Sequence, residues 1–105
     1  MLNIKIGHMD YHYQELECVS KEELKRGEVN FINREIKVDN TMDKPTIAET
    51  VIHEVIHAID DLMVIELEEN QVNQLGAGMA MFIKDNPMIV NKIINLLGEN
   101  DVDES

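Results

Sequence analysis

The chain has 105 residues and a formal net charge of −12, with 21 acidic residues against 9 lysines and arginines. This length supports one domain with a modest core and is too short for a peptidase with separate substrate-binding lobes. The scattered basic residues argue against nucleic-acid binding, and no apolar run is long enough to cross a bilayer, so neither a nucleic acid nor a membrane is an expected partner.

The first residues and the cysteine content favour a cytoplasmic protein. Residues 1–6 lack the long apolar core of a signal peptide, so the sequence gives no support for secretion. Cys18 is the one cysteine of the chain and cannot form an internal disulfide, which agrees with a reducing cytoplasm. We interpret Cys18 as a small buried apolar residue and not as a catalytic thiol.

The first forty residues predict a small, mostly antiparallel sheet. Apolar and polar residues alternate over 2–6 and again over 11–16, which predicts two strands. Residues 20–23 have the Ser-x-x-Glu pattern of a capping box, which predicts a short helical turn ended by Gly27. Residues 29–32 and 35–38 then predict a hairpin, in which the intervening Asn33 supplies the turn.

From Asp43 the apolar period becomes helical. Asp43 or Thr41 can cap a first helix, Pro45 is tolerated in its first turn, and the pattern continues to about Met63. At 100° per residue, one apolar band of this helix consists of Val51, Ile52, Val55, Ile56, Ile59, Leu62 and Met63. We expect this band to face the core.

Two further helices are predicted. The second begins at Glu68 or Glu69 and extends to about Lys84, and the third occupies residues 87–97. Together the elements predict an α+β fold for a single domain of residues 1–97, with the small sheet in the N-terminal half followed by about three helices. The remaining acidic segment, 98–105, is predicted to be a disordered tail.

The most informative pattern is H-E-x-x-H, formed by His53, Glu54 and His57 within the first predicted helix. Residues four apart on a helix lie one turn above each other, so both imidazoles can converge on one divalent ion. Glu54 lies about 100° around the helix from His53 and reaches the edge of that site as a base for a metal-bound water. Both histidines also lie nearly opposite the apolar band, so we interpret them as zinc ligands. The alternative is a solvated histidine face.

A catalytic zinc needs a third protein ligand. We choose Glu69, because at the start of the second helix it can point inward while that helix packs against the first. Glu68 and Glu66 are alternative ligands that we interpret mainly as turn residues. Asp60, one turn beyond the motif, is another alternative, or else a group that orients an imidazole without binding the metal.

Other polar residues lack a clear link to this site. His8 and His12 lie outside any ligand spacing, and we interpret both as structural or exposed. Tyr11, Tyr13 and His12 are the candidate donors for stabilising an oxyanion, but nothing in the sequence locates them near the metal.

Between about Ile4 and Leu97 the chain resembles the small zincin-like proteins encoded by bacteriophages and prophages. More distantly, it is similar to ImmA/IrrE-type metallopeptidase domains. The resemblance rests on a short β-rich half and on the segments 35–39, 50–60, 69–75 and 85–87, of which only the H-E-x-x-H block is highly specific.

The resemblance implies a minimal zincin-like domain with a gluzincin-like site. In such a site His53, His57 and a downstream glutamate bind zinc, and Glu54 is the base. Asn70 departs from the pattern, because a second acidic residue commonly follows the glutamate that aligns with Glu69.

We therefore expect a zinc metallopeptidase with one zinc per chain, acting narrowly on one intracellular protein such as a regulator. A zinc-binding regulatory protein of phage origin that cleaves nothing is the first alternative. The second is an acidic decoy that occupies the basic surface of a nucleic-acid-binding protein, for which the charge of −12 is the evidence. The sequence leaves the oligomeric state open.

Overall fold

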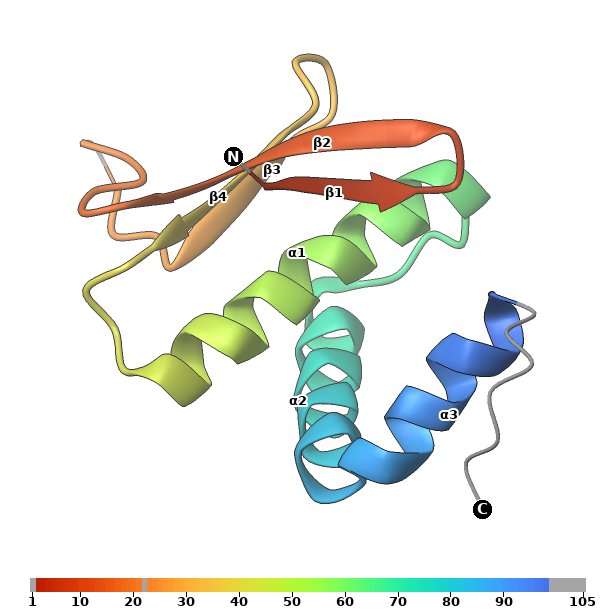
Figure 1. Ribbon diagram of the computed structural model, residues 1–105. Coiled ribbons are helices and arrows are strands. Elements are labelled where there is room, and N and C mark those ends of the chain that lie inside the picture. Colours follow the sequence, from red (N-terminus) through yellow and green to blue (C-terminus); the bar gives the residue numbers. More distant parts are fainter. Residues whose placement is uncertain (1, 22, 99–105) are drawn as a thin grey trace.

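The computed structural model describes residues 2–21 and 23–98. Over these residues the chain forms four strands followed by three helices, which confirms the predicted α+β fold (Figure 1). In chain order they are β1 (Asn3–Ile6), β2 (Met9–Leu16), β3 (Gly27–Asn30), β4 (Glu35–Asp39), α1 (Lys44–Met63), α2 (Glu69–Asp85) and α3 (Pro87–Leu97). The predicted bounds of the helices hold to within one residue.

The four strands form one mixed sheet in the order β1-β2-β4-β3. β1 pairs with β2 and β3 pairs with β4 in antiparallel fashion, as expected, whereas β2 and β4 lie parallel in the centre. β3 therefore forms one edge of the sheet, beside the helix that carries the H-E-x-x-H motif.

Helix α1 is the middle layer of the molecule. It lies along one face of the sheet, and α2 packs against α1 on the side away from the sheet (Figure 1). Between the sheet and α1 the core is formed by Tyr11, Ile36, Val38 and Ala58, all at most 1% exposed. The alternation of β4 directs Ile36 and Val38 to this one face.

The predicted core face of α1 is wrong in detail. The buried residues of this helix are Thr50, Glu54 and Ala58, which lie one turn apart on a single stripe. In the predicted apolar band, Ile59 and Met63 are exposed, at 36% and 65%. The reason is that α1 contacts both the sheet and α2, so its apolar residues are divided between two packing faces.

A helical turn is predicted at 20–23, but residues 20, 21 and 23, which the structure describes, are not helical. Ser20 Oγ does accept a hydrogen bond from the Glu23 N–H at 3.3 Å, as in a capping box, but no helix follows it among the described residues. A single turn without a packed face does not offset the cost of helix nucleation. Gly27 begins β3 instead of ending a helix.

Asn33 lies in the β3–β4 turn, as predicted, and the residue of this turn with a left-handed backbone is Arg34, with φ 57°. The turn is held by the Asn30 side chain, whose oxygen accepts the N–H groups of Ile32 and Asn33. Cys18 is exposed and not buried, and its thiol donates to the Ser20 carbonyl at 3.1 Å.

The C-terminal part of the chain is helical up to Leu97. Of the predicted tail 98–105, the structure describes Gly98, which caps α3, and the other residues lie outside its described range. None of the helices that the structure describes has the length and apolar character needed to cross a membrane.

Candidate metal centre

Helix α1 brings the two histidines of the motif together. The ring centroids of His53 and His57 are 4.8 Å apart, and the rings meet edge to face at 67°. Helix α2 crosses α1 at this point, because a Cβ added to Gly76 would lie 3.7 Å from His53 Cα. This is an ordinary van der Waals distance, so α2 packs directly on α1 beside His53 and carries its own first turn to the histidines.

A structured loop returns the chain from α1 to α2. The backbone is left-handed at Val64 and Glu66, with φ 54° and 68°. The Asp60 carboxylate accepts the N–H of Glu66 at 2.7 Å and that of Leu67 at 3.2 Å. Glu68 is the N-cap residue of α2 and forms a capping box with Gln71. These contacts fix where α2 begins, and the first residue of α2 is Glu69.

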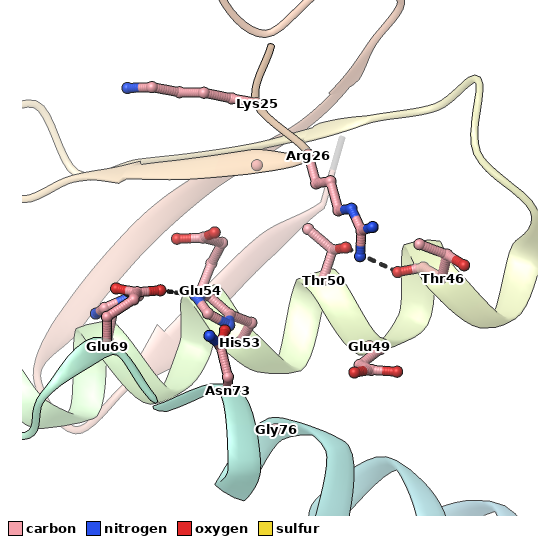
Figure 2. A pocket seen from close by; sticks show the side chains of 12 residues that line it. Lys25, Arg26, Thr46, Glu49, Thr50, His53, Glu54, Glu69, Asn73 and Gly76 are labelled. Carbon is pink, nitrogen blue, oxygen red and sulfur yellow. Dashed lines mark hydrogen bonds and ion pairs between the residues drawn. The ribbon is translucent and has the colours of Figure 1, made fainter. Parts of the chain in front are cut away.

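Glu69 completes a cluster with the two histidines. Its Oε1 lies 2.9 Å from His53 Nε2, and its Oε2 lies 3.2 Å from His57 Nε2 (Figure 2). One ligand atom from each residue can be chosen so that all three lie within 4.8 Å of one another. The three residues therefore form a group that could hold a metal ion.

The donor set of this cluster fits zinc. Two imidazole nitrogens and one carboxylate are the three protein ligands of many catalytic zinc sites, which leave a fourth position open. Zinc bonds of about 2.0–2.1 Å place tetrahedral ligand atoms roughly 3.3 Å apart. The two Glu69 contacts are close to that separation, and the Glu69 side chain is 63% exposed and free to adjust.

Of the alternative ligands, Asp60 lies in the last turn of α1, and Glu66 and Glu68 lie in the loop that leads to α2. The Asp60 carboxylate is engaged by backbone N–H groups, Glu66 provides one of those groups, and Glu68 caps α2. None of them belongs to the cluster of possible metal ligands found among the described residues. The alternative role of Asp60, to orient an imidazole without binding the metal, stays a prediction.

Glu54 lies on the stripe of α1 that faces the sheet and is 6% exposed. A Cβ added to Gly27 would lie 3.2 Å from Glu54 Oε2, so the first residue of β3 passes directly over this carboxyl group. Burial is the largest cause that raises the pKa of Glu54, from 4.5 to about 7. The charges of Glu69 and Glu28 add to the rise, and Lys25 opposes it. A carboxyl group with this pKa can both accept and release a proton near neutral pH.

The cluster and Glu54 share one cavity of about 560 Å³. Its other lining residues are Lys25, Arg26, Gly27, Thr46, Glu49, Thr50, Asn73 and Gly76. Sequence reasoning did not assign Lys25, Arg26 or Asn73 to the site. Asn73 lies one turn after Glu69, so helical spacing could have found it. Lys25 and Arg26 come from an irregular segment before β3, and in Figure 2 Arg26 points toward Thr46 while Lys25 extends along the other side of the strand from Glu54.

The tyrosines and the remaining histidines lie elsewhere. Tyr11 is 1% exposed in the core, and Tyr13 donates a hydrogen bond to Glu15 at 2.8 Å. His8 is exposed in the turn between β1 and β2, and His12 is partly exposed in β2. None of these four residues lines the cavity, so the donors near the cluster are instead Lys25, Arg26 and Asn73.

Comparisons of the chain with protein-family models, with curated proteins and with solved structures find no match. The function proposed for this protein therefore rests on the geometry of its candidate metal centre.

Proposed function

We propose that the protein is a zinc-dependent peptidase of narrow specificity, related to the small zincin-like proteins of phages and prophages. The observation that carries the proposal is the convergence of His53, His57 and Glu69 beside the buried Glu54 in one cavity. Zinc held by such a set acts as a Lewis acid toward a carbonyl oxygen and lowers the pKa of a water molecule toward neutrality.

The residues of the chain divide the remaining work. His53, His57 and Glu69 hold the ion, and the Glu54 carboxylate takes the proton of the attacking water and returns it to the leaving amine. Arg26 and Asn73 are the hydrogen-bond donors of the cavity that we assign to binding the substrate backbone.

The narrow specificity follows from the size of the site. A cavity of about 560 Å³ accommodates few side chains, so selection of a substrate has to come from docking outside it. We propose a single intracellular protein, such as a regulator, as the substrate. Unstructured general substrates such as casein should be cleaved poorly.

The first test is metal content. Protein incubated with excess zinc and then desalted should retain one zinc per chain, and the His53→Ala/His57→Ala variant should retain none. Stoichiometric zinc in the double variant would show that the ion is held elsewhere.

The second test separates a peptidase from a zinc protein that cleaves nothing. Glu54→Gln keeps the three proposed ligands and removes the base, so it should trap the substrate without cleaving it. Each captured protein is then incubated with the native enzyme, with and without a chelator. If the captured partners stay intact in both cases, the protein is not a peptidase, and the zinc-binding protein that cleaves nothing becomes the favoured function. Capture that ignores chelators and disappears at high salt identifies the acidic decoy.

A further inference from the structure

The helices α2 and α3 carry an apolar surface that the rest of the described chain does not cover. Helix α3 has no buried residue, although it consists mainly of apolar residues. In Figure 1 it begins at the end of α2 that lies farthest from the sheet, runs back toward the level of α1 and diverges from α2. Eleven apolar side chains of the two helices are between 38% and 83% exposed, namely Leu75, Met79, Met81, Phe82, Ile83, Met88, Ile89, Ile93, Ile94, Leu96 and Leu97.

Six of these residues form two matching stripes. On α2 the stripe is Leu75, Met79 and Phe82, and on α3 it is Ile89, Ile93 and Leu96. Each stripe has spacings of four and then three residues, which is the seam spacing of helices that pack in bundles. The six side chains are 38% to 63% exposed, so contacts within the described chain do not cover either stripe. We call these six residues the bundle surface.

A groove beside the bundle surface is open to solvent. It has a volume of about 420 Å³ and is lined by Leu67, Gln71, Gln74, Leu75, Gly78 and Met79. A Cβ added to Gly78 would meet no atom within 4 Å. The groove therefore has room for a side chain from another molecule at the level of Gly78.

The charge of the chain points to a second copy as that molecule. The whole chain carries −12, but residues 70–98 contain only Lys84, Asp85 and Lys92 as charged residues, a formal charge of +1. Two acidic copies repel each other across most faces, and this hairpin is the face where they can meet with their carboxylates kept apart. A strongly charged partner would find no complementary charges on the six residues of the bundle surface.

We propose that two copies of the chain associate through the bundle surface and form a four-helix bundle from two α2–α3 hairpins. At roughly 100 Å² each, the six side chains of the bundle surface offer on the order of 600 Å² per copy. This is somewhat below the roughly 800 Å² per partner of a standard interface, and the other exposed apolar side chains of α2 and α3 are available to add to it. A closed twofold arrangement uses the same surface of each copy and leaves no further surface for growth. This proposal does not depend on the metal centre or on peptidase activity.

The test is the molar mass of the full-length protein by light scattering at about 10 to 100 µM. The wild type should have twice the 12.1 kDa of one chain. Its thermal unfolding midpoint should rise with protein concentration, because dilution favours dissociation. A mass of one chain over this whole range, with a midpoint independent of concentration, overturns the proposal.

Two variants locate the interface. Ile93→Glu places a charge in the α3 seam and should halve the mass. Gly78→Lys should do the same without harming the monomer, since a side chain there meets no atom of its own chain and lysine favours a helix more than glycine does. Ile32→Glu, at a residue that is 92% exposed in the β3–β4 turn, should leave the dimer intact.

The outcomes are distinct. A dimer that survives both Ile93→Glu and Gly78→Lys, or that is lost in Ile32→Glu, overturns the assignment to the bundle surface. Sedimentation with neutral phosphatidylcholine vesicles tests whether the apolar face binds a membrane instead of a second copy. If the wild type is monomeric and sediments with these vesicles, the apolar face binds a membrane, and the proposal that a second copy covers it is wrong.

Discussion

Glu54→Gln should stabilise the metal-free protein at pH 8 and leave its stability nearly unchanged at pH 4.5. The Glu54 carboxyl is buried, and its pKa is raised from 4.5 to about 7. Between these two values the folded protein holds a proton that the unfolded chain has released. The free energy of unfolding therefore falls as the pH rises through this window, and above pH 7 this cost is fully present.

The magnitude follows from the shift in pKa. One pKa unit corresponds to about 1.4 kcal/mol, so the rise from 4.5 to about 7 costs the folded state about 3 kcal/mol at pH 8. Glutamine has nearly the same shape and no charge, so the variant avoids this cost. With an m-value of roughly 1 kcal/mol per molar urea for a chain of this size, the urea midpoint should rise by about 3 M at pH 8.

The assay is urea unfolding of chelator-treated protein at equal concentrations between pH 4.5 and pH 8. Glu49→Gln is the matched control, because Glu49 is an exposed carboxylate on the same helix and lines the same cavity. It should show no comparable dependence on pH. A difference between Glu54→Gln and the wild type that stays constant across this range would refute the argument that burial of the Glu54 charge opposes folding.

Three other outcomes are expected. The His53→Ala/His57→Ala variant should lose the rise in thermal midpoint that zinc produces in the wild type, which a melting curve with and without zinc measures. Glu69→Ala should weaken zinc binding by at least about tenfold in a competition titration with a chelating dye, whereas Glu66→Ala should change it little; equal effects would reject Glu69 as the third ligand. Gly27→Ala should lower the free energy of unfolding by about 1 to 3 kcal/mol, because its Cβ would lie 2.8 Å from a methyl group of α1 and 3.0 Å from a backbone oxygen of β4; an unchanged urea midpoint would contradict this.

The parts of the fold that could be predicted are those with strong local signals. The long apolar period of α1 and the proline at the start of α3 define helices without help from tertiary contacts. The position of Glu69 could be predicted for the same reason, since a helix that packs back on α1 places its first turn near the motif. The capping-box pattern at Ser20 did not predict a helix correctly. Its hydrogen bond forms, but no apolar helical face packs there to stabilise a helix.

The parts that could not be predicted depend on pairing between distant segments. The parallel pairing of β2 with β4 brings β3 to the edge of the sheet beside α1. That placement carries Lys25 and Arg26 over the cavity, and no local pattern in the sequence indicates it. The same placement of β3 and β4 buries Glu54 and Ala58 of α1, whereas hydrophobic periodicity favoured other residues of this helix for the core.

The location of Glu54 is itself an argument for function. The stripe that contains it packs under β3 and β4, and a glutamine or an apolar residue of similar size would fill the same place without a charge. Burial of a carboxyl group there opposes folding, since it raises the pKa of Glu54 to about 7. A costly ionisable group beside a cluster of possible metal ligands, in a shared cavity, is the arrangement expected of a residue retained for proton transfer. A purely structural role for this helix would not require an acid at that position.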